Sequence, residues 1–270
     1  MTPAERASAV AFALKNCALG NLSPDEATLQ AARLYEHEGG DPARLLTAAG
    51  RHAPSAIFAR TVALNEHGWR GSGDLKELQA IHLALFDGVH EDAGKLRTKN
   101  VKDHETDSGA VTRRVNGGLN GGLNGAVDAK DAVIASGPLD DDPQAFFPAN
   151  LITTGAMNIS TELAEQRNLR SLDRAVFTHA LAKIYDELGY LHPFNGGNAM
   201  VLRIFASRLA HDAGWDLDWG EVTRERYRKA RRQACRGDIT GFESLFADIQ
   251  RPANPTRVFL IAGWDQGPAH

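Results

Sequence analysis

Residues 192–203 read H-P-F-N-G-G-N-A-M-V-L-R and follow an apolar stretch with helical spacing. Pro193 forbids continuation of that helix, because proline lacks a backbone N–H and clashes with the preceding turn. Phe194 is able to fill the core beneath the turn. We therefore expect Pro193 and Phe194 to anchor a loop that holds His192 at a fixed place on the protein surface.

The second half of this stretch is suited to binding an anion. Gly196, Gly197 and Asn198 can adopt the backbone angles that turn successive N–H groups into one concavity. The next helix adds its positive dipole end, and Arg203 carries a planar charged fork. A histidine beside such a cradle can accept a proton from a hydroxyl while the cradle stabilises charge on a phosphate. The residues predict phosphate binding by Gly196, Gly197, Asn198 and Arg203, and catalysis by His192.

Each part of this pattern also has an ordinary structural interpretation. A His-Pro pair is a common helix stop, a Gly-Gly pair is a common turn, and an arginine on a helix commonly faces solvent. The order of all these parts within twelve residues favours the functional interpretation.

The first part of the chain indicates several short helices. The segments T-P at residues 2–3 and S-P-D-E at residues 23–26 are typical helix starts, with a hydroxyl cap, an early proline and acidic residues. Two further helices are expected near residues 42–50 and 54–65. Residues 1–73 are therefore predicted to form an N-terminal helical subdomain.

Helical patterns continue over residues 74–250, the predicted core domain. Apolar residues recur at three- and four-residue spacing in 74–86, 150–165, 171–188, 219–235 and 238–250. Ser171 is expected to cap the third of these helices, with Asp173 nearby, and Gly189 to break it. The C-terminal tail, residues 251–270, contains a short β-like run at 258–262. Because clear strands are otherwise lacking, the sequence predicts an all-α architecture.

Residues 100–148 differ from their surroundings. Glycine and asparagine dominate residues 116–125, where N-G-G-L occurs twice in tandem. The β-capable pairs at residues 111–112 and 133–134 allow a small hairpin. The segment is predicted to be a long loop or flap outside the core.

Composition excludes several classes of protein. The chain has 30 Lys plus Arg against 34 Asp plus Glu, a net charge of −4, so no overall field favours nucleic acid or an anionic membrane. Cys17 and Cys235 stand alone, which predicts neither a disulfide framework nor a zinc site. No apolar run approaches the roughly 20 residues of a membrane span. The sequence predicts a cytoplasmic protein, with signal-free delivery to another cell as an effector left open.

The stretch at residues 192–203 resembles the signature of the Fic family (the Fic/Doc superfamily), H-P-F-x-[D/E]-G-N-G-R-x-x-R. The matching positions are His192, Pro193, Phe194, Gly197, Asn198 and Arg203. Residues 81–97 resemble the family's upstream helix and its A-G-x-x-R segment. Phe147-Pro148 resembles the start of the next family helix, and residues 227–242 resemble the closing helices. The resemblance covers roughly residues 74–250.

Membership implies an all-helical core, a β-hairpin flap within residues 100–148 that docks the target, and a protein adenylyltransferase activity (AMPylation). Most members move AMP from ATP to a Ser, Thr or Tyr hydroxyl of a target protein, and relatives move UMP, phosphocholine or a phosphate. Carried over, His192 is the base and Phe194 anchors the loop. Gly197 and Asn198 form the phosphate cradle, and Arg203 is a phosphate ligand.

Three positions depart from the family pattern. Gly196 replaces the acid that holds Mg²⁺, Ala199 replaces a glycine, and Met200 replaces the arginine for the outer phosphates. We therefore predict ATP as donor, no metal ligand in the motif and a doubtful Mg²⁺ site, with Asp92 and Asp103 as carboxylates from elsewhere. The alternative is a catalytically impaired Fic-fold module that binds or regulates a partner.

The family's inhibitory helix, written Ser/Thr, three residues, Glu, then Gly or Asn, is not found. Glu38-Gly39 is preceded by Leu34 at the required place, and Glu165 is followed by Gln166. Control by a separate antitoxin-like chain is therefore a possible partnership. The arginine cluster at residues 224–232 is interpreted as a solvated helix face and not as a nucleic-acid patch.

Overall fold

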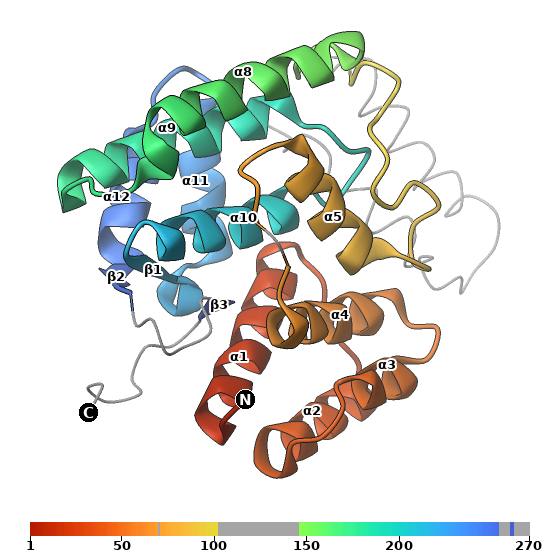
Figure 1. Ribbon diagram of the computed structural model, residues 1–270. Coiled ribbons are helices and arrows are strands. Elements are labelled where there is room, and N and C mark those ends of the chain that lie inside the picture. The colour runs from red at the N-terminus through yellow and green to blue at the C-terminus, as the bar shows by residue number, and fades with distance from the viewer. Residues whose placement is uncertain (70, 102–145, 254–259, 262–270) are drawn as a thin grey trace.

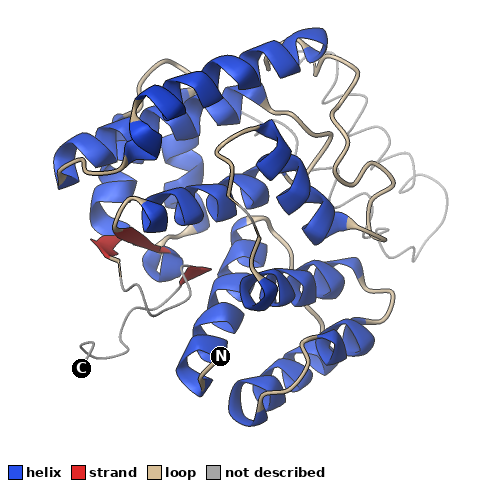
Figure 2. Ribbon diagram, viewed as in Figure 1, coloured by secondary structure: helices blue, strands red, loops and turns tan. Residues whose placement is uncertain are grey.

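The structure is a computed structural model of the chain that describes residues 1–69, 71–101, 146–253 and 260–261. Helices make up most of it, and the strands are few and short (Figure 2). The predicted all-α architecture is therefore confirmed. The hairpin expected in the flap lies outside the described residues, as does most of the flap itself.

The N-terminal helices form a group in the lower part of Figure 1, comprising α1 (Pro3–Leu19), α2 (Glu26–Glu38), α3 (Ala43–Ala49) and α4 (Ala53–His67). α1 begins where predicted, because Thr2 and Glu5 exchange side-chain and backbone hydrogen bonds in a capping box. α2 begins later than predicted, since Asp25 and not Ser23 caps it. Pro24 thus precedes the helix. A carboxylate caps as well as a hydroxyl does, so local sequence left both starts open.

The remaining elements follow in the order α5 (Leu75–Phe86), η1 (Ala149–Leu151), α8 (Ile152–Glu165), η2 (Arg167–Leu169), α9 (Arg174–Leu191), α10 (Asn198–Asp212), β1 (Trp215–Asp218), η3 (Trp219–Glu221), α11 (Arg224–Ala234), α12 (Thr240–Ile249), β2 (Gln250–Pro252) and β3 (Leu260–Ile261). The η elements are 3-10 helices. α10 runs through the middle of the molecule, with α8 and α9 above it and the N-terminal helices below it in Figure 1.

α9 differs from its prediction at both ends. Asp173 caps it by accepting hydrogen bonds from the next amides, while Ser171 lies before the cap with a positive φ. The helix also continues through Gly189 to Leu191, so the predicted break at Gly189 is wrong. One glycine costs a helix only about 1 kcal/mol. The true end is set by Pro193.

A three-stranded sheet in the order β2-β1-β3 was not predicted in full. β1 occupies residues 215–218, pairing antiparallel with β2 and parallel with β3, where Leu217 faces Leu260. Only the β-like run at 258–262 was expected, and β3 lies within it. The predicted helix from residue 219 starts instead at Arg224. The strand partners of β1 lie more than thirty residues downstream, so no local pattern indicates them.

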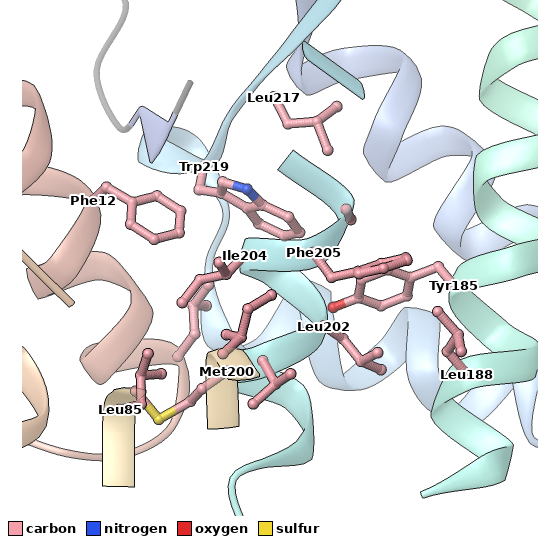
Figure 3. Close-up of a cluster of buried hydrophobic side chains, with 14 of the residues drawn as sticks. Phe12, Leu85, Tyr185, Leu188, Met200, Leu202, Ile204, Phe205, Leu217 and Trp219 are labelled. Atoms are coloured by element: carbon pink, nitrogen blue, oxygen red, sulfur yellow. The ribbon is translucent and has the colours of Figure 1, made fainter. Parts of the chain in front are cut away.

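One continuous cluster of buried side chains joins the N-terminal helices to the rest of the fold. Figure 3 shows Phe12 of α1, Leu85 of α5 and Trp219 of η3 in the same cluster as Ile204 of α10. α10 is buried along almost its whole length. The helix that follows the predicted loop is therefore the central element of the core.

Glu77 of α5 adds a polar link to α10. Its carboxylate accepts hydrogen bonds from Arg208 Nε at 2.8 Å and Nη2 at 2.6 Å. It also accepts from Trp69 Nε1, Ser72 N and Gly73 N. Because every acceptor position of the buried carboxylate is used, the ion pair can persist in the core.

Neither Cys17 nor Cys235 forms a disulfide. Burial raises the pKa of the Cys17 thiol to about 12, so it stays protonated and unreactive at neutral pH. None of the helices in the described part of the chain combines the length and apolar character that a membrane crossing requires.

Candidate functional site

The predicted anion-binding loop is the connection between α9 and α10. α9 ends at Leu191, and His192 caps it with left-handed backbone at φ 43°. Pro193 follows, and α10 begins at Asn198 with Gly197 before it at φ 72°. The histidine, the glycines and the helix N-terminus thus lie on one short connection, as the sequence predicted.

His192 is buried, with 3% of its surface exposed, so the prediction of a surface position is wrong. The Phe146 ring stacks on the imidazole with centroids 3.8 Å apart and planes 16° apart. Among the described residues, Nδ1 of His192 is buried and has no hydrogen-bond partner. The sequence pattern fixed the position of His192 along the chain but did not reveal Phe146, which lies 46 residues upstream.

Burial and charge together keep the His192 imidazole neutral. Burial lowers the pKa of His192 well below its ordinary value, and the positive charges of Arg231 and Arg97 lower it further. Arg231 lies over the Phe146 ring that stacks on the imidazole, with its guanidinium carbon 5.5 Å from the ring centroid. A neutral imidazole can accept a proton, which is the state that a general base requires.

Arg97 holds the backbone on either side of the histidine. Its Nε donates to the His192 carbonyl at 2.6 Å, and its Nη2 donates to the carbonyls of Leu191 and Phe147. Its own amide donates to the Pro193 carbonyl at 2.9 Å. These bonds satisfy carbonyls at the end of α9 that have no helical donor. Arg97 therefore fixes where the loop leaves the helix.

The two ends of the loop are joined by an amide side chain. Asn198 accepts a hydrogen bond from Phe194 N at 3.0 Å through Oδ1 and donates to Phe194 O at 2.8 Å through Nδ2. The side chain of Asn198 is thereby used within the loop, and its backbone N–H is what it can offer to an anion. The Phe194 ring is buried and stacks on His82 at 4.0 Å.

α5 supports the glycines from below. A Cβ on Gly197 would overlap the Phe86 ring, and its φ of 72° also disfavours a side chain. The Gly196 carbonyl bonds His82 Nε2 at 3.1 Å, and Gly94 N donates to His82 Nδ1 at 2.8 Å. Since Nδ1 accepts, Nε2 carries the proton and donates it to Gly196.

The N-terminus of α10 keeps amide donors for a ligand. Met200 N and Val201 N both donate to the Gly197 carbonyl, at 3.0 and 3.1 Å. The first donors of the helix are therefore the N–H groups of Asn198 and Ala199, which have no preceding turn to bond. Such a helix end attracts anions.

Arg203 points toward α1. Its Nε donates to Asn16 Oδ1 at 2.6 Å and its Nη2 to the Asn16 carbonyl at 3.1 Å. The guanidinium carbon lies 5.1 Å from the Tyr227 ring centroid, and the side chain is fully buried. Within the described residues Nη1 has no acceptor. The contact with Asn16 was not anticipated, and it uses Nε and Nη2 of the predicted phosphate ligand while Nη1 is buried.

Curated relatives match the chain in part. Over 118 residues it is 35% identical to a protein adenylyltransferase of Bartonella henselae, covering 43% of this chain and 21% of the relative. Over 88 residues it is 34% identical to the probable protein adenylyltransferase Fic of Escherichia coli K12, covering 33% of this chain and 44% of the relative. The chain spans less than half the length of these relatives. No family model matches it.

A solved structure matches the fold more fully. It is the N-terminal Fic domain of a VirB-translocated Bep effector protein from Bartonella quintana, with bound ADP. The TM-score is 0.58 at 22% identity, over 81% of this chain and 90% of that one. This chain has the fold of a Fic domain. The resemblance drawn from the sequence is confirmed.

Met200, which stands at the first arginine position of the Fic pattern, belongs to the hydrophobic core. Met200 is 4% exposed and lies in the same buried cluster as Leu85 (Figure 3). Its sulfur would be 3.4 Å from a Cβ on Gly20 of the N-terminal region. Met200 therefore fills an apolar packing position where the family pattern has an arginine.

A magnesium ion does not fit the residues that this Fic loop presents. Gly196 offers no carboxylate, and the Asp92 carboxylate accepts a hydrogen bond from Asn195 Nδ2 at 3.0 Å. Asp103 lies outside the described residues. No group of three or more His, Cys, Asp or Glu side chains that might hold a metal occurs in the described ranges.

Sequence reasoning did not assign functions to His82, Arg97 or Asn16. His82 contacts a residue 114 positions away, so its partner is not visible in the local sequence. A usable signal existed, because residues 81–97 carry the resemblance to the family's upstream helix. For Asn16, which is 187 positions from Arg203, no local pattern was available.

Proposed function

We propose that this Fic domain transfers AMP from ATP to a hydroxyl of a target protein, as a protein adenylyltransferase. The observation that carries the proposal is one short loop that begins with His192 and ends at the N-terminus of α10. The partial identity to proteins named adenylyltransferases supports the choice of group.

In this proposal the target's hydroxyl oxygen attacks the α-phosphorus, and its proton passes to the neutral His192 imidazole. The bond between the α-phosphorus and its bridging oxygen breaks, and pyrophosphate leaves with the electron pair. The N–H groups of Gly197 and Asn198 and the dipole of α10 stabilise the charge on the transferred phosphate. Nη1 of Arg203 is the remaining cationic donor for a phosphate oxygen.

The proposal requires that a hydroxyl comes within hydrogen-bond distance of His192. The imidazole is buried under the Phe146 ring, so that ring needs to shift when a target binds. Replacement of Phe146 by alanine is therefore expected to increase modification of His192 by an imidazole-selective reagent. The His192→Ala chain supplies the background signal.

Incubation of the purified chain with labelled ATP, divalent metal and lysate tests the transfer. We expect a labelled band that is lost in His192→Ala and retained in His179→Ala. His179 is an exposed histidine of α9 that pairs with Glu243, so its replacement is the control. Calorimetry with ATP, ADP, UTP and CDP-choline identifies the donor before a target is known. Absence of labelling and of binding with every donor would reject the proposal.

A second candidate is a catalytically impaired Fic module that binds or regulates a partner. It is favoured by the core position of Met200 and by the missing acid at Gly196. Gly196 is not in the left-handed region, so Gly196→Glu is compatible with the backbone. Labelling that appears only in Gly196→Glu, alone or combined with Met200→Arg, would favour this candidate. Equal labelling in the natural chain would reject it.

We further propose that the chain acts on a protein target in the cytoplasm or after delivery as an effector, and that a separate antitoxin-like protein is a candidate inhibitor. The support for delivery is the fold shared with a protein described as VirB-translocated. Fractionation of donor and recipient cells distinguishes the two locations, and co-purification from the source cells tests for the inhibitor.

A further inference from the structure

Helix α11 and the turn that closes it concentrate positive charge on an otherwise acidic protein. Residues 224–236 hold seven arginines and lysines against one acidic residue, Glu225, whereas the whole chain has a net charge of −4. Tyr227, Ala230 and Ala234 are buried, so one side of the helix faces the core and most of the basic side chains lie on the other. Like charges at this density repel one another, which indicates a surface for a negatively charged partner.

Two of these cations already serve the fold. Arg226 forms an ion pair with Asp248 of α12, and Arg224 donates a hydrogen bond to Asn21 Oδ1 at 2.9 Å. These contacts tie α11 to α12 and to the turn that follows α1. The charges of Arg224 and Arg226 are therefore not counted in the surface proposed below.

Three other cations have no such partner. Lys229 and Arg236 are exposed, and Arg228 is half-buried with an Nε that has no hydrogen-bond partner among the described residues. Over the described ranges, none of the three takes part in an ion pair. Arg236 lies in the turn after α11, where its amide donates to the Gln233 carbonyl at 2.9 Å. We call Arg228, Lys229 and Arg236 the α11 basic patch.

The α11 basic patch lies near the histidine of the Fic loop. Arg231 follows Arg228 by one turn on the same side of α11, and it lies over the Phe146 ring that stacks on His192. Arg231 and Phe146 also line a small cavity together with Tyr190, which is 43% exposed at the end of α9. A polypeptide that crosses this cavity and brings a hydroxyl to His192 therefore has the basic patch within reach of its neighbouring residues.

An acidic segment of polypeptide fits this surface better than a nucleic acid does. A nucleic acid duplex presents a continuous line of phosphates. The patch is short and is bordered by Glu221 and Glu225, which are both exposed and would repel such a line. Carboxylates spaced along an extended chain can meet the cations one at a time and avoid these glutamates.

We propose that the α11 basic patch binds an acidic segment of the target protein beside the hydroxyl that receives AMP. Its role as a substrate-docking surface rests on the proposed function. The binding of an acidic segment does not, because it needs neither nucleotide nor transfer. The three cations act on the binding of the target and not on the reacting atoms.

Binding is measured on the full chain without nucleotide, by the fluorescence anisotropy of a labelled glutamate-rich peptide. A glutamine-rich peptide of the same length is the uncharged comparison. We expect the glutamate-rich peptide to bind at least about tenfold more tightly, and the difference to shrink as salt is raised, because exposed charges are screened. Equal binding of the two peptides overturns the inference.

Two double charge reversals with the same change in net charge locate the binding surface. Lys229→Glu with Arg236→Glu changes two exposed cations of the patch. Arg44→Glu with Arg51→Glu changes two exposed cations of α3 and the turn after it, which lie away from α11 in Figure 1. We expect the first pair to weaken binding of the glutamate-rich peptide about tenfold or more, and the second by less than about twofold. Equal losses in both overturn the inference.

A labelled DNA duplex tests the other kind of polyanion. Tighter binding of the duplex than of the glutamate-rich peptide at equal salt, lost in Lys229→Glu with Arg236→Glu, would overturn the choice of an acidic polypeptide.

Transfer from labelled ATP to an acidic peptide that carries serine and tyrosine tests the docking role. Lys229→Glu with Arg236→Glu is expected to raise KM about tenfold and to leave kcat unchanged. A lowered kcat with an unchanged KM overturns that role. If the glutamate-rich peptide binds as expected while no peptide or protein is labelled, the proposed function fails and the binding surface stands.

Discussion

The loop between α9 and α10 and the first turns of α10 belong to the same motif, but different interactions hold them. In the loop, Arg97, His82 and Asn198 bond the backbone from His192 to Gly196. On α10 the side chains hold the helix in place, since Met200 packs in the apolar core and Arg203 donates a hydrogen bond to Asn16.

This difference explains which parts of the motif survive substitution. The conformation of the loop is held by backbone hydrogen bonds to His82 and Arg97, which do not depend on the side chain at position 200. A charge at position 200 needs a particular side chain, and here that side chain packs apolar surface. The loop conformation and the packing of Met200 are therefore set by separate interactions.

The largest expected effect breaks the anchorage of α10. Glu77→Ala leaves the Arg208 guanidinium buried without its main acceptor, which is expected to lower the free energy of unfolding by about 3–5 kcal/mol. Urea unfolding followed by circular dichroism measures the change. Glu26→Ala removes the exposed partner of Arg33 and is expected to cost less than about 1 kcal/mol. Similar losses of unfolding free energy in Glu77→Ala and Glu26→Ala would show that the buried ion pair does not anchor α10.

The next effect breaks the loop. Gly197→Ala adds a methyl group that overlaps the Phe86 ring at a φ of 72°, with an expected cost of about 2–4 kcal/mol and loss of ADP binding. Gly237→Ala is the matched control, since its φ is 81° and no atom lies within 4 Å of the added carbon. We expect the control to lose only about 1–2 kcal/mol and to bind normally. Normal ADP binding by Gly197→Ala would show that the loop tolerates the shift.

A third prediction uses pH to weaken the support under the loop. Burial and the nearby His90 lower the pKa of His82, the Gly196 bond and Asp92 partly oppose them, and the pKa falls from 6.5 to about 4. The folded protein therefore resists protonation, and the stability from neutral His82 is present above pH 6.5 and lost as the pH falls toward 4. The loss from this group is at most about 3 kcal/mol.

Unfolding measured between pH 7 and 4 tests this prediction. His192, whose pKa is also lowered, contributes in the same direction, so the comparison is made in a His192→Ala background. His82→Gln in that background is expected to flatten the profile. A profile that keeps its slope would assign the loss to other groups.

The smallest effect concerns position 200. Met200→Gln keeps the length of the side chain but buries an amide without a partner, which is expected to cost about 1–3 kcal/mol. Met200→Leu keeps an apolar side chain and is expected to cost less than about 1.5 kcal/mol. Thermal unfolding of the two variants side by side measures the difference. Equal stability would place this side chain outside the core and nearer to a ligand.

Local chemistry explains why much of the fold was predictable. Pro193 ends α9 close to where the sequence indicates, and Thr2 caps α1 as expected. Helical spacing located most helices because their apolar faces repeat along the chain. The loop and its place between two helices follow from these same local signals.

Long-range contacts explain what was missed. β1 exists because strands far downstream pair with it, and Arg203 turns toward α1 because Asn16 offers two oxygens there. His192 is buried because Phe146 covers it. Each of these contacts joins residues that are far apart in the sequence, so local spacing and composition do not predict it.

The bond between Arg203 and Asn16 has a consequence for dissecting the molecule. A truncated chain that starts at the predicted boundary, residue 74, would lose both acceptors of the guanidinium and the aromatic face of Phe12. We expect such a fragment to aggregate on expression and to be degraded rapidly by protease, because its central helix would be stripped along one side. The N-terminal helices α1–α4 therefore share one hydrophobic core with the rest of the fold.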